Sequence, residues 1–276
     1  MHSKIADALK LQYEPVAILW SDERPAGALG FKGCGSGCAM VLFAQVAAKG
    51  KTAAFDKDNF GCFGGGVGLG FGRQYQNFPL GGVEAFKYFL STGLEGQGRD
   101  DLAEKACSLG RKELVENLLH GEGYKKTPAL VDDFLKELPA MVVPGRYVVF
   151  LPLRNVGEED VPAVVVFLAD AHQLSALIGL ANYDRAGVEN VFVPMGAGCH
   201  QIGIYAFREA EQEHPRAVLG LTDISARKNV RHILGEEVFT FALPYQRFLE
   251  MENNVKGSFL ERSTWKSLAG DEMASL

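Results

Sequence analysis

Glycine and cysteine occur together in this sequence, and their pairing restricts the fold more than any other feature does. Of the 276 residues, 32 are glycine, well above the usual share of about 7%. Four of the five cysteines directly follow a glycine: Cys34, Cys38, Cys62 and Cys199. Glycine permits positive φ and lets the main chain come close to a bulky group. We therefore expect these segments to form loops around an inorganic core.

The four glycine-linked cysteines predict one buried metal site, which we interpret as a [4Fe–4S] iron–sulfur cluster. The N–H groups of the glycine segments at 61–66 and 195–199 suit a nest for an anion, and N–H to sulfur hydrogen bonds stabilise thiolate clusters. The chain lacks the C-x₂-C-x₂-C run of ferredoxins. Zinc ligation, thiol–disulfide chemistry at Cys34 and Cys38, and structural packing therefore stay open as alternatives.

Three further residues stand near these segments or share their chemistry. Cys107 follows Ala106 in a helical pattern, which predicts a packed core thiol outside the site. His200, next to Cys199, is a weak candidate for a proton donor or a hydrogen-bond partner, and a local capping or surface role is its alternative. Arg73 closes the second glycine tract and is a weak candidate for binding an anionic substrate, against the alternative of a solvated side chain.

Charge and hydropathy exclude several classes of protein. The formal net charge of −6 argues against nucleic acid or an anionic membrane as the main partner, because both require a clustered positive surface. No apolar run approaches the roughly 18 residues that would span a bilayer, and the N-terminus does not read as a secretory leader. These features predict a cytoplasmic protein, in whose reducing environment cysteines serve metal ligation or catalysis more often than disulfides.

The order of the expected elements predicts an α/β or α+β fold with a mixed sheet flanked by helices. We expect strands at 14–20, 52–55, 146–153, 163–168, 189–193, 217–221 and 237–242. We expect helices at 38–49, 82–90, 99–119, 171–186, 201–212 and over most of 244–268. No linker or low-complexity stretch divides the chain, so residues 1–276 are expected to form a single domain.

A weak internal repeat underlies a further hypothesis. Shifting the sequence by 137 residues aligns Phe55 with Phe192 and Gly61-Cys62 with Gly198-Cys199. An internal duplication, with halves at about 14–140 and 141–276, would place two equivalent cysteine loops around a pseudo-twofold axis. The alternative is that glycine richness produces such matches by accident.

The chain resembles the family called domain of unknown function 169 over nearly its whole length. The resemblance rests on these segments: Glu14–Ala17, Cys38 with Lys49-Gly50, Cys62–Gly65, Gly68–Gly70, Ala163–Ile178, Gly198-Cys199 and Asp223–Leu234. It implies recurring cysteines at the positions of Cys38, Cys62 and Cys199, whereas Cys34 is less typical of the family. The resemblance implies nothing specific about substrate.

The leading functional hypothesis is an iron–sulfur protein whose ligands are Cys34, Cys38, Cys62 and Cys199. The cluster would pass electrons to a redox partner, or activate a small-molecule substrate at an iron left open if Cys34 does not ligate. The sequence leaves open whether the protein is an enzyme such as an oxidoreductase, and whether it forms a homo-oligomer. The main alternative is a non-redox protein that binds zinc or a small molecule and has structural cysteines.

Overall fold

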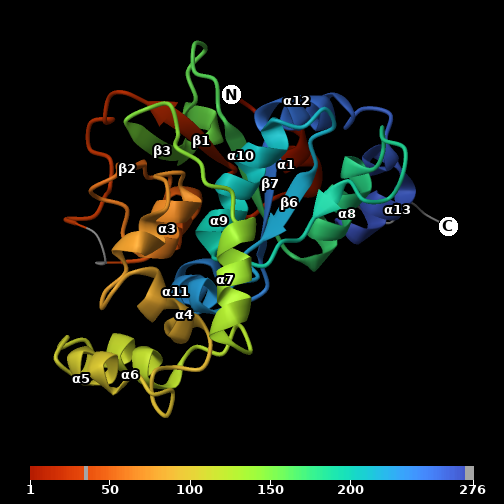
Figure 1. The fold of residues 1–276 in the computed structure, drawn as a ribbon. Helices are drawn as coiled ribbons and strands as arrows, with labels where there is room; N and C mark the ends of the chain where they lie inside the picture. The colour runs from red at the N-terminus through yellow and green to blue at the C-terminus, as the bar shows by residue number, and fades with distance from the viewer. Residues whose placement is uncertain (34–36, 271–276) are drawn as a thin grey trace. The chain divides into compact units, whose positions relative to one another are not determined.

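A computed structural model describes residues 1–33 and 37–270 (Figure 1). The described part contains a mixed sheet of seven strands flanked by helices, which confirms the predicted α/β class. The strands are β1 (Val16–Ser21), β2 (Ala53–Phe55), β3 (Tyr147–Pro152), β4 (Val164–Ala169), β5 (Val191–Phe192), β6 (Ala217–Gly220) and β7 (Phe239–Pro244). Their order is β2-β3-β1-β4-β7-β6-β5, and among these pairs only β5 and β6 run parallel.

Contacts within the chain divide it into two units. The first comprises residues 1–71 and the chain from Met141 onward, and it holds the sheet. The second comprises residues 72–140 and is built from helices. The single domain and the internal duplication anticipated from the sequence stay predictions.

The core of the first unit lies on both faces of the sheet. Strand β4 is buried at all six positions, which explains its unbroken apolar sequence. Alternate residues of a strand point to opposite faces, so Ala17, Val165 and Phe241 share one face and pack there with the helices. The elements that cover this face are α1 (Lys4–Leu9), η2 (Leu153–Asn155), α8 (Ala171–Ala181), α12 (Tyr245–Asn253), η3 (Phe259–Glu261) and α13 (Ser263–Leu268).

The opposite face of the sheet carries the helices that matter for the site. Phe43 of α2 lies edge-on to Phe150 of β3 at 5.9 Å between ring centroids, and Trp20 of β1 meets Phe207 of α10 at 5.3 Å. Helix α11 packs along α2, and α3 packs against α9. The elements on this side are α2 (Ala39–Lys49), α3 (Phe63–Gly68), α9 (Gly198–Ile202), α10 (Ile204–Ala210) and α11 (Ile224–Leu234).

The second unit has a small aromatic core. Tyr75 stacks on Phe86 with ring centroids 4.0 Å apart, and Phe78 approaches the same ring at 5.2 Å. Lys87 bridges the side chains of Glu84 and Asp132. Its elements are η1 (Gln74–Asn77), α4 (Val83–Leu90), α5 (Asp100–Cys107), α6 (Lys112–His120) and α7 (Pro128–Glu137).

Two expectations for the second unit are wrong. The single helix expected at 99–119 is two helices, α5 and α6, because Gly110 between them has a φ of +66° that ends the helical path. Cys107 is exposed rather than packed in the core. Helix α7 was not anticipated, although Thr127 followed by Pro128 is a recognisable start: the Thr127 hydroxyl accepts a hydrogen bond from the Leu130 N–H.

Two expectations for the first unit also differ from the structure. The second glycine tract, expected to be a loop, contains the helix α3 from Phe63 to Gly68. The helix expected at 201–212 is divided into α9 and α10 at Gly203, where φ is −112° and ψ is −104°. Both differences arise where α3 and α9 meet, which is also where the cysteines lie.

The strand order bears on the proposed duplication. Strands β1 and β4 pair antiparallel next to each other, and each has an antiparallel neighbour on its outer side, β3 or β7. The aligned residues Phe55 and Phe192 lie in β2 and β5, at opposite edges of the described sheet. The proposed halves contribute unequally to the described sheet, since 14–140 supplies β1 and β2 while 141–276 supplies the other five strands. The edge strand β2 pairs antiparallel with its neighbour, whereas β5 pairs parallel. The strand order therefore does not decide the question, and the duplication stays a prediction.

Candidate functional site

Three of the four predicted cysteines lie at the starts of three helices that pack together. Cys38 is the N-cap of α2, Cys62 is the N-cap of α3, and Cys199 is the second residue of α9. Helices α3 and α9 lie side by side (Figure 1), and α2 also contacts α9. Cys38 and Cys62 are half-buried, while Cys199 is buried. Cys34 falls outside the described residues.

Glycines allow the main chains of α3 and α9 to touch. A Cβ at Gly68 would lie 2.5 Å from the carbonyl carbon of Cys199 and 2.7 Å from its Cβ. A Cβ at Gly203 would collide with the carbonyl oxygen of Gly68. Glycine is required at both positions because any larger residue would force the helices apart. This contact holds Cys199 against α3.

The start of α2 joins the same cluster of helices. A Cβ at Gly198 would lie 3.1 Å from Cγ of Met40, and a Cβ at Gly65 would lie 3.5 Å from Cβ of Ala39. The first residue of α2, Ala39, therefore faces α3, and the second, Met40, faces α9. Cys38, which directly precedes them, is held near the other two thiols.

The Phe31 ring fills the space between the segments that precede Cys38 and Cys62. A Cβ at Gly61 would lie 2.7 Å from this ring and 2.8 Å from the carbonyl oxygen of Gly37. Gly61 also has a φ of +81°, which independently favours glycine. Gly61, which directly precedes Cys62, therefore allows its segment to pack closely against Phe31 and Gly37.

The three thiols interact electrostatically. Burial, and to a smaller extent the nearby Cys38, raise the pKa of Cys62 to about 11. Burial raises the pKa of Cys199 well above its usual value, with added contributions from Cys62 and Cys38. Burial also raises the pKa of Cys38. These thiols are protonated at neutral pH unless a cation stabilises their thiolates, so metal binding here would release protons.

Backbone N–H groups partly offset the free-energy cost of forming thiolates in this buried site. The Gly65 N–H donates to the Sγ of Cys62 at 3.2 Å. The N–H groups of Met40 and Val41 lower the pKa of Cys38, and that of Met40 also lowers the pKa of Cys199. The site therefore presents N–H donors as well as sulfur to a bound group.

Helix α11 contributes two residues that the sequence analysis did not single out. Asp223, its N-cap, accepts hydrogen bonds through Oδ2 from the Gly198 N–H (3.0 Å) and through Oδ1 from the Ser225 N–H (2.9 Å). The Asn229 side chain hydrogen-bonds to the Cys38 thiol. The D-x-S start of α11 was visible as a helix cap, but nothing local linked it to Gly198.

The two weaker candidates differ in their surroundings. His200 is fully buried in α9, and burial lowers its pKa to about 3, so its imidazole is neutral at physiological pH. Its ring centroid lies 6.2 Å from that of Tyr205. Arg73 is exposed and belongs to the second unit. A functional role for either residue stays a prediction.

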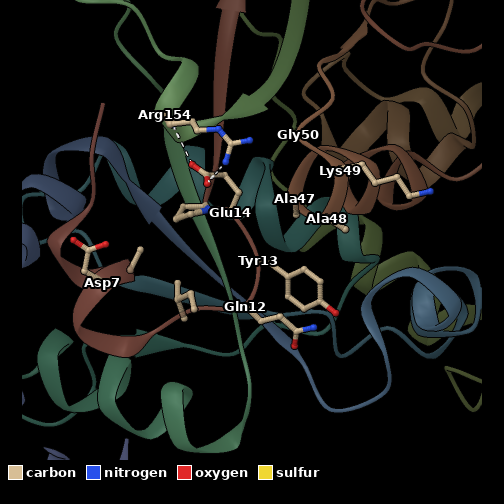
Figure 2. Close-up of a pocket in the computed structure, with 12 residues that line it drawn as sticks. Asp7, Gln12, Tyr13, Glu14, Ala47, Ala48, Lys49, Gly50 and Arg154 are labelled. Carbon is tan, nitrogen blue, oxygen red and sulfur yellow. Dashed lines mark hydrogen bonds and ion pairs between the residues drawn. The ribbon is translucent and has the colours of Figure 1, made fainter. Parts of the chain in front are cut away.

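A separate cavity of about 450 Å³ lies at the other end of α2. Figure 2 shows Arg154 and Glu14 pointing toward each other in its wall, with Nη1 of Arg154 2.6 Å from Oε2 of Glu14. Lys49 and Gly50, at the C-terminal end of α2, line the same cavity. An 11-residue helix is about 16 Å long, so this cavity is distinct from the cysteine site.

Two features are absent from the part of the chain that the structure describes. Within residues 1–33 and 37–270, no group of three or more His, Cys, Asp or Glu side chains is arranged to hold a metal ion. In the same part of the chain, no helix is both long and apolar enough to cross a membrane.

Comparison with known proteins identifies a family for this chain. Neither a curated protein nor a solved structure matches the chain. The family described as "Uncharacterised ArCR", domain of unknown function 169 (DUF169), matches residues 4–254. That range contains all five cysteines and the starts of α2, α3, α9 and α11. The chain belongs to the DUF169 family.

Proposed function

We propose that this protein holds a [4Fe–4S] cluster through Cys38, Cys62 and Cys199, with Cys34 as the fourth ligand, and that the cluster transfers electrons. One observation carries the proposal: thiols from three separate segments lie at the starts of three helices, of which α9 contacts both α2 and α3. The predicted cytoplasmic location and the absence of nucleic-acid and membrane partners belong to the same proposal.

The donor set suits an iron–sulfur cluster. Soft thiolate ligands favour such clusters, and a cluster with four thiolates is negatively charged, so N–H donors near the sulfurs stabilise it. The Gly65 N–H already donates to Cys62, and the N–H groups of Met40 and Val41 face Cys38. When bound, the cluster supplies one-electron transfer, while the residues of this chain hold it and limit its contact with water.

Binding would require the thiols to change position. As described, the side chains form no group arranged to hold a metal ion. Cys38 and Cys62 occupy N-cap positions with extended backbone conformations, so their side chains can rotate without breaking a helix. Cys34, three residues before Gly37 in the sequence, would complete the set.

Thiol–disulfide chemistry is less well supported. A reactive cysteine needs a substantial thiolate fraction, which follows from a lowered pKa. Burial instead raises the pKa of Cys38, and it raises that of Cys62 to about 11. An exchange reaction at Cys38 would therefore begin from a protonated thiol.

The experiment is anaerobic purification of the full chain, followed by analysis of iron and acid-labile sulfide and a visible absorption spectrum. We expect iron and sulfide in equal amounts and a broad absorption near the visible–ultraviolet boundary. Cys38→Ser, Cys62→Ser and Cys199→Ser should each lose most of the cluster. Cys107→Ser is the matched control, because Cys107 is exposed in the second unit and should leave the cluster intact.

Several results would contradict the proposal. A colourless protein without sulfide, or stoichiometric zinc in place of iron, would refute it. If the Cys107→Ser variant lost as much cluster as the other three variants, the loss would not identify Cys38, Cys62 and Cys199 as ligands. A Cys34→Ser variant that keeps the full cluster would remove Cys34 from the ligand set and would favour substrate binding at an open iron.

A further inference from the structure

We infer that the cavity at the C-terminal end of α2 binds a small monocarboxylic acid, with Arg154 as its anchor and Lys49 as a second cation. The cavity holds about 450 Å³, which lies within the range of roughly 300–1,000 Å³ usual for small-molecule sites. Its wall includes Glu14 and Lys49-Gly50, which belong to segments that carry the family resemblance. The inference concerns a second site and does not depend on the proposed cluster.

Glu14 holds the Arg154 side chain by one edge. Oε2 of Glu14 accepts a hydrogen bond from Nη1 of Arg154 at 2.6 Å, and Oε1 accepts one from the main-chain N–H of the same arginine at 3.2 Å. Both carboxylate oxygens are thus bound to Arg154, and the Glu14 side chain is only 23% exposed. The guanidinium is therefore oriented before a ligand arrives, which reduces the entropy lost on binding.

The opposite edge of the Arg154 guanidinium is available to a ligand. Within residues 1–33 and 37–270, no hydrogen bond engages its Nε or Nη2, and the side chain is 59% exposed. A Cβ at Gly50 would lie 2.9 Å from Nη2, so the absence of a side chain there leaves this edge uncovered.

Arg216 shows how such an edge holds a carboxylate. Its Nε and Nη2 donate to Oε2 and Oε1 of Glu209 at 3.1 and 2.7 Å. The same two atoms are the free ones in Arg154. Because a planar guanidinium matches a carboxylate with two parallel hydrogen bonds, a ligand carboxylate fits Arg154 in the same fork.

Lys49 supplies a second positive charge beside that edge. It is the last residue of α2 and directly precedes Gly50 (Figure 2). Its side chain is exposed, and no carboxylate in the described part of the chain pairs with it. The other acidic residue in the wall, Asp7, lies 2.7 Å from His2, measured between Oδ2 and Nε2. Among the described residues that line the cavity, both carboxylates are thus already paired, whereas Lys49 and one edge of Arg154 are not.

The wall favours a singly charged acid. The C-terminal end of a helix carries partial negative charge, so the end of α2 opposes a doubly charged phosphate more than it opposes a carboxylate. Gln12 lines the cavity with an amide that can both donate and accept hydrogen bonds, and Pro15 and Ala47 add buried apolar surface. A carboxylate at Arg154 with a small remainder in this mixed surface suits the cavity.

The test is a titration of the isotope-labelled full chain with acetate, lactate and benzoate at constant ionic strength, followed by nuclear magnetic resonance of its N–H groups. Acetamide, lactamide and benzamide are the matched uncharged probes. We expect saturable shifts of the Arg154 Nε–H and the Gly50 N–H with at least one acid and with none of the amides.

Three variants assign the binding to the cavity. Arg154→Gln should weaken binding roughly tenfold, because it removes a charged pair of hydrogen bonds. Lys49→Gln should weaken it about threefold, the scale of an exposed ion pair. Lys51→Gln is the matched control and should leave the affinity unchanged, because Lys51 is exposed two residues further along the chain and is not among the residues that line the cavity.

Four results would overturn the inference. They are no saturable shift with any of the three acids, equal shifts from acids and amides, shifts from inorganic phosphate where the acids have no effect, and equal weakening by Lys49→Gln and Lys51→Gln. Arg154→Gln leaves Glu14 without its partner, so Lys49→Gln keeps the test decisive should that variant not fold. The titration does not depend on iron or sulfide content, so this inference and the proposed function can fail separately.

Discussion

Replacing Gly68 by alanine tests the contact that brings α3 and α9 together. Gly68 is the last residue of α3, and an added Cβ would lie 2.5 Å from the carbonyl carbon of Cys199 and 2.7 Å from its carbonyl oxygen. Ordinary van der Waals contact begins at 3.4 Å. The two helices would therefore have to separate by roughly an ångström in a densely packed interior.

Two effects of opposite sign determine the change in stability. Overpacking a core costs about 1–3 kcal/mol, and the upper end applies here because the contacted atoms belong to the main chain. Alanine in place of a helical glycine stabilises by about 1 kcal/mol at most, and by less at the end of a helix. We expect a net loss of about 2 kcal/mol in the free energy of unfolding, or a factor of about 30 in the unfolding equilibrium.

The assay is denaturant unfolding of the metal-free protein, compared with the unmodified chain and with Gly33→Ala. A Cβ at Gly33 would meet no atom of residues 1–33 or 37–270 within 4 Å, so that control should change little. Gly68→Ala should also retain less iron after reconstitution, because Cys199 moves with α9. A free energy of unfolding within about 0.5 kcal/mol of the unmodified chain, the usual range for surface substitutions, would refute the close contact between the two helices.

Three further predictions concern parts of the molecule outside the cysteine site. The side chain of Arg247 is 1% exposed and donates hydrogen bonds to Asp184 and Glu250 at 2.7 Å each. Arg247→Met should therefore lower the free energy of unfolding by about 3 kcal/mol, measured by denaturant unfolding. An unchanged denaturation midpoint would contradict this prediction. The hydrogen bond from Arg247 lowers the pKa of Asp184 in the folded protein. The Asp184 carboxylate therefore stabilises the fold at pH values above its unfolded pKa of about 3.9. This stabilisation is lost as the pH falls through the pKa that Asp184 has in the folded state. Thermal unfolding between about pH 5 and pH 2 should show this loss, and Arg247→Met should reduce it. Thr127→Ala removes the N-cap of α7 and should cost about 1 kcal/mol, seen as faster amide hydrogen exchange in that helix but not in α2.

Much of the fold was predictable because local patterns agreed with the final structure. The apolar run at 163–168 became the buried strand β4, and the helix expected at 38–49 became α2, which ends at Gly50 with a φ of +63°. Burial on both faces requires a continuous apolar strand, and a left-handed C-terminal residue favours glycine. Such features depend on neighbours in the sequence, so the sequence reveals them directly.

The candidate site was predictable only in part. The glycine before each cysteine singled out Cys38, Cys62 and Cys199 without indicating how the segments would meet. Asp223 and Asn229 were missed because their contacts join α11 to residues far away in the sequence.

The sequence by itself determined the class of fold, the main strands and the residues whose chemistry could form a site. Tertiary structure alone decided that the glycine tract holds a helix and that a second helix divides at Gly203. The physical reason is distance in the chain: glycine weakens local preference for any one conformation. Contacts between remote segments, such as that of Gly68 with Cys199, therefore determine where such a tract folds and what it brings together.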